Sequence, residues 1–147
     1  MKSKVSLLLL VLTLCFSLNA QKLSFNNEGE FKIVQFTDMH YVQGNPKSDT
    51  TLQLIPKVLD AEKPDLVIFT GDIVTGSIKG WDDITKYVID RKIPFAVTLG
   101  NHDHENGVTR EEIAEFVTSY PYNVNTINNI GGRVMNDVIP VDNNGSD

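Results

Sequence analysis

The sequence contains a single cysteine, Cys15, among 147 residues. Cys15 lies within residues 1–20, which we expect to be removed from the mature protein. The mature chain would then have no disulfide bond, no thiolate metal ligand and no cysteine nucleophile. A lipoprotein signal would require a small residue before Cys15, and Leu14 stands there. The scarcity of cysteine therefore excludes every mechanism that attacks through a thiolate.

Long apolar runs are also missing, apart from one at the N-terminus. Lys2 and Lys4 make the N-terminus positively charged, and residues 5–18 are nearly all apolar. Ala20 is a small residue suited to cleavage, so the segment has the pattern of a secretory signal peptide. A membrane anchor is the alternative, but a run of 14 residues is shorter than a spanning helix requires, which is roughly 20. We therefore expect cleavage near Ala20, no stable membrane anchor, and a periplasmic or secreted protein.

Basic residues are few, with 13 Lys and Arg against 19 Asp and Glu, a net charge of −6. Without residues 1–20, which carry two lysines and no acid, the net charge becomes −8. Such a chain repels phosphate backbones, so no nucleic acid is expected as a partner. Two other signatures are absent or incomplete. No Gly-x-Ser-x-Gly nucleophile motif occurs, and Gly71–Ser77 has the glycine spacing of a phosphate-binding loop without its lysine.

Three apolar runs rich in β-branched and aromatic residues predict strands. They are Phe31–Phe36, Leu66–Phe69 and Phe95–Leu99. Helix-length segments follow each of them, at Asp49–Glu62, Trp81–Asp90 and Arg110–Tyr120. This alternation predicts an α/β fold with a mainly parallel sheet and flanking helices.

Two details refine the helices. Pro56 stands in the middle of the first one, so that helix either starts near Pro56 or kinks there. Thr109 and Glu112 form a capping box that starts the third helix. Beyond the third helix the chain is rich in asparagine, with Gly131-Gly132 as a turn and Arg133–Val141 as a possible strand. It stops at Asp147 without a closing element, so we expect residues 21–147 to be one domain truncated at its C-terminus.

Each predicted strand ends in a polar cluster. The clusters are Thr37-Asp38-Met39-His40, Thr70-Gly71-Asp72 and Gly100-Asn101-His102-Asp103. Taken singly, each is a weak signal, because strand ends often carry turn residues and helix caps. The carboxyl ends of parallel strands, however, line one edge of a sheet, and ligands bind there. Asp72 lies 34 residues after Asp38, and Asn101 lies 29 residues after Asp72. Each spacing is about one strand-helix-strand unit, so we expect the clusters to converge.

The residue types suit a pair of divalent cations. Asp38 and His40 can present an oxygen and a nitrogen to one ion, and the carboxylate of Asp72 can bridge two ions about 3.5–4 Å apart. Asn101 adds a neutral oxygen, which limits the negative charge around the pair. His102 is then free to protonate or stabilise a departing oxygen.

At these residues the sequence resembles the calcineurin-like metallophosphoesterase superfamily, whose signature is Asp-x-His, Gly-Asp and Gly-Asn-His-Asp/Glu at successive strand ends. The resemblance covers Phe31 to Tyr122 and indicates the N-terminal half of the domain, in a secreted bacterial-type branch. It implies an αββα sandwich with a two-metal site at one edge. It also implies a hydrolase that cleaves phosphate esters with a metal-bound hydroxide, using manganese, iron or zinc.

The resemblance assigns roles residue by residue. Asp38 and His40 correspond to ligands of the first metal, Asp72 to the bridging ligand and Asn101 to a ligand of the second metal. His102 corresponds to the catalytic histidine. Asp103 corresponds to the acidic position that follows it, and we place it with His102 in the catalytic pair.

Two departures from the family pattern leave alternatives open. The family supplies three further histidine ligands from the second half of the domain, and no histidine follows His104, so we expect this chain to lack that half and to be inactive alone. Thr75 stands where relatives carry an aspartate that orients the catalytic histidine or a metal-binding tyrosine, so what orients His102 is open. His104 and Glu105 are expected at the surface or the substrate entrance. The alternatives are a non-catalytic metal-binding remnant and, among enzymes, a phosphodiesterase or nuclease.

Overall fold

The computed structural model describes residues 22–105, 107–131 and 133–143. The predicted signal peptide, residues 1–20, lies outside the described residues, as do residues 144–147. Within the described ranges, none of the helices combines the length and the apolar character needed to cross a membrane.

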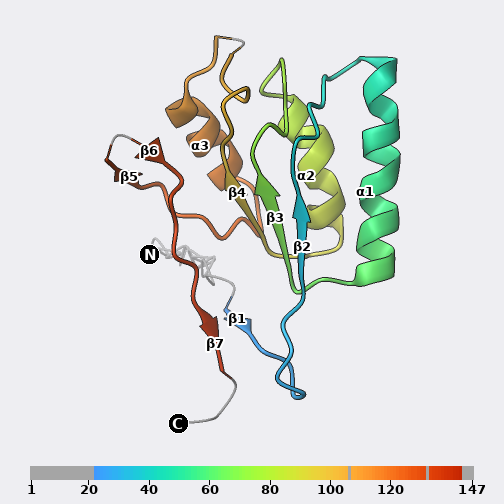
Figure 1. The fold of residues 1–147 in the computed structure, drawn as a ribbon, viewed down its shortest axis with the longest axis vertical. Coiled ribbons are helices and arrows are strands. Elements are labelled where there is room, and N and C mark those ends of the chain that lie inside the picture. The colour runs from blue at the N-terminus through green and yellow to red at the C-terminus, as the bar shows by residue number, and fades with distance from the viewer. Residues whose placement is uncertain (1–21, 106, 132, 144–147) are drawn as a thin grey trace, which may run out of the picture.

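A three-stranded parallel sheet forms the centre of the structure (Figure 1). Its strands are β2 (Ile33–Phe36), β3 (Leu66–Thr70) and β4 (Phe95–Thr98), in the order β2-β3-β4. Phe36 pairs with Phe69, and Phe69 pairs with Val97, so the strands end nearly level with one another. The three predicted strands are confirmed, and their parallel order brings their carboxyl ends to one edge of the sheet.

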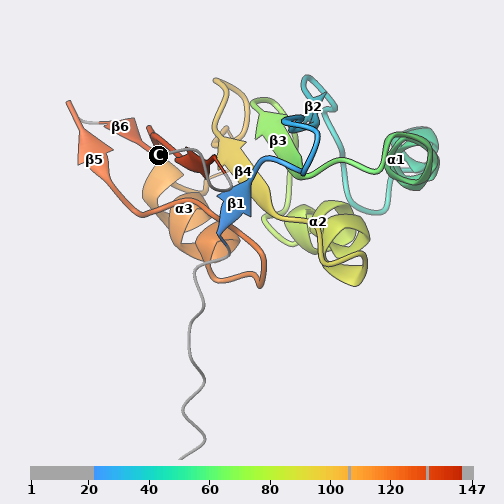
Figure 2. The ribbon, with the colours of Figure 1, turned by 90° about the horizontal axis from the view of Figure 1, so that it is seen from below.

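Three helices flank the sheet and confirm the predicted α/β class. They are α1 (Asp49–Glu62), α2 (Gly80–Asp90) and α3 (Arg110–Thr118). Figure 2 shows α2 and α3 beneath one face of the sheet and α1 beyond its β2 edge. Alternate strand residues face these helices and join the core; they are Val34, Phe36, Val67, Phe69, Phe95 and Val97. On the opposite face Ile33 is 50% exposed and Gln35 is also exposed.

The core is built around Phe69, in the middle strand. Its ring lies 5.7 Å from that of Phe36, 6.1 Å from that of Phe95 and 6.3 Å from that of Trp81, measured between centroids. Trp81 is 1% exposed, so it is a core residue of α2. Close packing here fixes the strands relative to α2, and hence fixes the loops that leave their ends.

Helix α1 runs through Pro56, so of the two alternatives predicted for this helix, a start near Pro56 is wrong. A short 3-10 turn, η1 (Pro46–Ser48), leads into it. The helix ends at Glu62, and the capping residue that follows, Lys63, has a left-handed φ of 48°. Proline in a helix interior costs about 3 kcal/mol or more. Burying Ile55 and Leu59, each 1% exposed, contributes about 1.5–3 kcal/mol per side chain and offsets that cost.

Helix α3 starts as its capping box predicts. The Thr109 side chain accepts a hydrogen bond from the Glu112 N–H, and the Glu112 carboxylate accepts one from the Thr109 N–H. The helix stops at Thr118, two residues before the predicted Tyr120, because Ser119 and Tyr120 form a closing turn.

The segment after α3 differs from the prediction. Instead of one strand over Arg133–Val141, β6 (Arg133–Val134) pairs antiparallel with β5 (Asn129–Ile130), and β7 (Val141–Asp142) pairs parallel with β1 (Leu23–Ser24). Met135 has a φ of 61°, which interrupts the extended backbone after β6. Pro140 then precedes β7 and has no N–H to donate to a sheet.

Candidate metal centre

The loops that leave β2, β3 and β4 meet at one edge of the sheet, as predicted. The backbone N–H of Asp38 donates to the carbonyl of Gly71, at 3.1 Å, and the N–H of His40 donates to the carbonyl of Asp72, at 2.9 Å. These bonds hold the first two clusters side by side. Because the partners lie more than 30 residues apart in the chain, only the parallel pairing of β2 with β3 brings them together.

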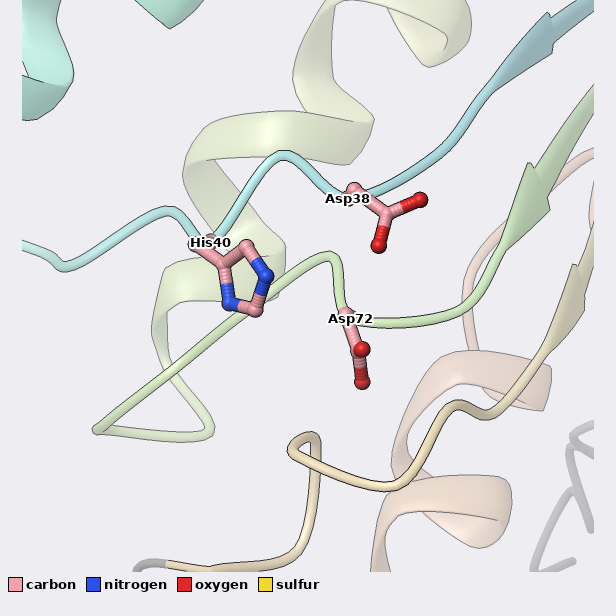
Figure 3. Close-up of side chains that lie close together, drawn as sticks. All are labelled: Asp38, His40 and Asp72. Carbon is pink, nitrogen blue, oxygen red and sulfur yellow. The ribbon is translucent and has the colours of Figure 1, made fainter.

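Asp38, His40 and Asp72 form a compact group of side chains of the types that bind metal ions (Figure 3). A carboxylate oxygen of each aspartate and a ring nitrogen of His40 lie within 4.8 Å of one another. Asp38 and His40 are exposed, whereas Asp72 is buried. Ligand atoms that share one cation lie roughly 3–4 Å apart when each bond is about 2.1 Å long. The atoms lie near that spacing, and their oxygen and nitrogen types suit a divalent cation.

The backbone at these residues is held in an unusual conformation. Asp38, His40 and Asp72 all have positive φ, at 52°, 44° and 52°. A left-handed conformation costs a non-glycine residue about 1–3 kcal/mol, and it persists where the surroundings over-determine it. Here it turns the side chains of successive loops toward one point. The Thr37 hydroxyl also donates to the Asp38 carboxylate at 2.6 Å, a contact that orients Asp38 and that sequence reasoning missed.

Gly100 explains why the apolar run of β4 stops at a glycine. A Cβ on Gly100 would lie 2.2 Å from Oδ1 of Asp72, and a Cβ on Gly71 would lie 2.9 Å from the Cα of Gly100. The loops after β3 and β4 therefore cross in direct backbone contact, with no room for a side chain at either glycine. The same Oδ1 of Asp72 accepts the N–H of His102 at 2.8 Å.

Asp103 is buried, 6% exposed, and contacts the backbone of Asp72. One carboxylate oxygen accepts the N–H groups of Asp72 and Gly100, at 2.9 and 2.7 Å. The other accepts those of Ile73 and Val74, at 2.9 and 3.2 Å. One carboxylate thus binds the two loops to each other through four backbone donors.

Asn101, the fourth predicted metal ligand, is exposed in the loop after β4. Its neighbours on both sides are anchored, because Gly100 donates to Asp103 and His102 donates to Asp72. Asn101 is therefore held next to the Asp72 carboxylate by its backbone.

His102 stands beside this group and has its own carboxylate partner. Its Nδ1 lies 2.7 Å from Oε1 of Glu105, and its ring centroid lies 5.6 Å from that of His40. The hydrogen bond to Glu105 raises the pKa of the His102 imidazole above its usual range. The charges of Glu105, Asp72 and Asp103 act in the same direction, and partial burial opposes them. Glu105 is exposed, in line with its predicted place at the surface or the substrate entrance. Its pairing with His102 was not predicted, although its position three residues after His102 on a tight loop was the available signal.

Thr75 and His104 have other contacts. The Thr75 hydroxyl lies 3.3 Å from Nδ1 of His40, so this position contacts His40 and not His102. His104 is exposed and lies 3.4 Å from Arg110, whose guanidinium donates to the carbonyls of Leu99 and Gly100. Arg110 thereby ties the start of α3 to the loop after β4.

The family model for calcineurin-like phosphoesterases matches residues 31–146. The chain belongs to this family. The group formed by Asp38, His40 and Asp72 agrees with this membership.

Three similar proteins come from different organisms. The phosphatase DCR2 of Saccharomyces cerevisiae is 39% identical over 71% of this chain and 22% of its own length. The probable inactive purple acid phosphatase 14 of Arabidopsis thaliana is 33% identical over 84% of this chain and 37% of its own length. An uncharacterized metallophosphoesterase of Aquifex aeolicus is 33% identical over 55% of this chain and 31% of its own length. The chain thus spans well under half the length of these calcineurin-like relatives.

Proposed function

We propose that the protein to which this chain belongs is a hydrolase that cleaves phosphate esters with two divalent cations. The observation that carries the proposal is the group of Asp38, His40 and Asp72, assembled from two loops by backbone hydrogen bonds and held in left-handed conformations. Its presence in a member of the calcineurin-like phosphoesterase family supports a catalytic use of that group.

Each ligand has a defined task in this proposal. Asp38 and His40 would hold the first ion, Asn101 would hold the second, and Asp72 would contribute to both. Mixed nitrogen and oxygen ligands suit manganese, iron and zinc alike. When bound, the cations polarise the phosphoryl group and make a nucleophile available from water at neutral pH.

The residues around the ligands complete the site. His102, half-exposed beside His40, donates a proton to the leaving oxygen of the ester. Asp103 acts through position rather than through proton transfer, because four backbone N–H groups occupy its two oxygens. It keeps the Asp72 loop and the His102 loop at a constant separation.

A second candidate is a protein that binds metal without hydrolysing esters. Names of several relatives favour it, since three Arabidopsis thaliana proteins that are 33% identical to this chain are described as probable inactive purple acid phosphatases. The two candidates differ in turnover and in metal content. A hydrolase should bind about two ions, and a metal-binding remnant one or none.

The deciding experiment replaces Asp72 with Asn in the full-length protein and compares it with Asp90→Asn, the same change at an exposed site at the end of α2. Metal content is measured by elemental analysis, and turnover is measured with an aryl phosphate monoester and a diester. We expect Asp72→Asn to lose both metal and turnover, while Asp90→Asn retains both. Full turnover by Asp72→Asn would refute the proposal, and metal binding by a wild type without turnover would favour the second candidate.

A further inference from the structure

We propose that Glu105 is the positioning residue for His102, in place of the carboxylate that the position of Thr75 does not provide. The proposal rests on the proposed function, because His102 needs a task in ester cleavage for its orientation to matter. The observation that carries it is the 2.7 Å contact between Nδ1 of His102 and Oε1 of Glu105.

The loop between β4 and α3 is built to make this contact. The backbone N–H of His102 donates to the Asp72 carboxylate, which fixes the backbone from which the His102 side chain extends. The N–H of Glu105 then donates to the carbonyl of His102 at 3.3 Å, closing a turn that returns the chain toward the imidazole. The backbone of His102 is bound to Asp72 and its Nδ1 to Glu105, so the imidazole ring is restricted in its rotation.

Other groups near His102 are already engaged. Both oxygens of Asp103 accept backbone N–H groups, and Oδ1 of Asp72 accepts the backbone of His102 itself. The Thr75 hydroxyl lies against His40. Among the described residues, Glu105 is therefore the carboxylate that pairs with the His102 ring.

The contact also determines which ring nitrogen carries out the chemistry. An ionised carboxylate only accepts hydrogen bonds, so Nδ1 of His102 carries a proton and points it at Glu105. Nε2 is left as the nitrogen that exchanges a proton with the substrate. In the cleavage step the Nε2–H bond breaks, its electron pair stays on nitrogen, and the proton joins the leaving oxygen. The neutral imidazole that remains still has its proton on Nδ1.

The contact between His102 and Glu105 contributes little to the stability of the fold. The side chains of His102 and Glu105 are 42% and 51% exposed, and an exposed ion pair contributes little to folding. Removing Glu105 should therefore leave the fold intact while releasing the ring, so a change in activity can be read separately from a loss of structure.

The test uses Glu105→Ala and Glu105→Gln in the full-length protein, with Glu115→Gln as a control on the exposed surface of α3. Turnover is measured with 4-nitrophenyl phosphate, which has a good leaving group, and with phenyl and alkyl phosphates, which have poor ones. Proton donation contributes about 10²–10⁴-fold to a step that needs it. We expect Glu105→Ala to lower kcat at least tenfold for the poor leaving groups, to change it little for 4-nitrophenyl phosphate, and to leave KM unchanged.

Two further comparisons make the test specific. Glu105→Gln keeps an oxygen that accepts from Nδ1, so it should recover part of the lost kcat. The double variant His102→Ala/Glu105→Ala should be no slower than His102→Ala alone, because Glu105 acts through His102. An equal loss of kcat for every leaving group, or additive losses in the double variant, would overturn the proposal.

A measurement without substrate or metal separates this proposal from the proposed function. Nitrogen-detected NMR of the metal-free protein, at a pH where His102 is neutral, reports which ring nitrogen carries the proton. We expect the Nδ1-protonated form in the wild type and a mixture of both forms in Glu105→Ala. The same mixture in the wild type refutes the positioning role even if the enzyme is active. A wild type that loads no metal and cleaves no ester refutes the proposed function, and the NMR result then still shows whether Glu105 holds the ring.

Discussion

Replacing Asp103 with Asn tests whether one buried carboxylate joins the two loops of the metal centre. The substitution preserves the shape of the side chain but removes its charge. The remaining amide oxygen can accept two of the four backbone N–H groups, which come from Asp72, Ile73, Val74 and Gly100. The new NH₂ group then faces the other two donors and cannot accept from them.

The expected loss follows from those contacts. A hydrogen bond to a charged group contributes about 1.5–3 kcal/mol, and two such bonds are lost at a site where Asp103 is 6% exposed. We therefore expect Asp103→Asn to lower the free energy of unfolding by about 3–6 kcal/mol, a large part of the roughly 5–15 kcal/mol of a typical domain.

The assay is urea unfolding of the full-length protein, followed by circular dichroism, with Asp90→Asn as the control. The substitution should lower the urea concentration at the midpoint of unfolding and leave the dependence of the unfolding free energy on urea concentration unchanged. Stability of Asp103→Asn within about 0.5 kcal/mol of the control, the range of ordinary surface substitutions, would refute the reasoning.

Two further predictions concern neighbouring residues. Gly100→Ala should lower metal affinity at least tenfold in calorimetric titrations, because its Cβ would displace the Asp72 carboxylate from a position 2.2 Å away, and unchanged affinity would contradict the crossing of the loops. The pKa of His102 should lie above its usual range in an NMR titration of the metal-free protein, mainly because of its hydrogen bond to Glu105. Since the folded-state pKa is raised, the stabilisation from this pair is present at pH values below the unfolded-state pKa and is lost as the pH rises through the folded-state pKa. Glu105→Gln should bring the pKa of His102 back down, and an equal pKa in both proteins would contradict that cause.

Local sequence was sufficient for much of the architecture. The capping box at Thr109 predicted the start of α3, because its partners lie three residues apart. The apolar runs predicted β2, β3 and β4, and their spacing predicted that Asp38 and Asp72 would meet at one edge. The course of the first helix at Pro56 was ambiguous from sequence. The free-energy cost of a proline inside a helix is local, but the burial of Ile55 and Leu59 that offsets it is a property of the folded chain.

The environment of each functional side chain required the tertiary structure. The sequence shows an acidic residue at position 103. It does not show which groups that residue contacts, because Asp72, Ile73 and Val74 lie about 30 residues away in the chain. The left-handed backbone of Asp38, His40 and Asp72 likewise depends on hydrogen bonds between loops.

The sequence by itself determined which chemical groups this protein brings to its sheet edge and in what order, because strand, helix and cap signals act over a few residues. Only the tertiary structure decided that Glu105 pairs with His102 and that Thr75 contacts His40. The physical reason is that a hydrogen bond depends on distance and angle within a few tenths of an ångström, and the packing of loops, rather than spacing along the chain, sets those values.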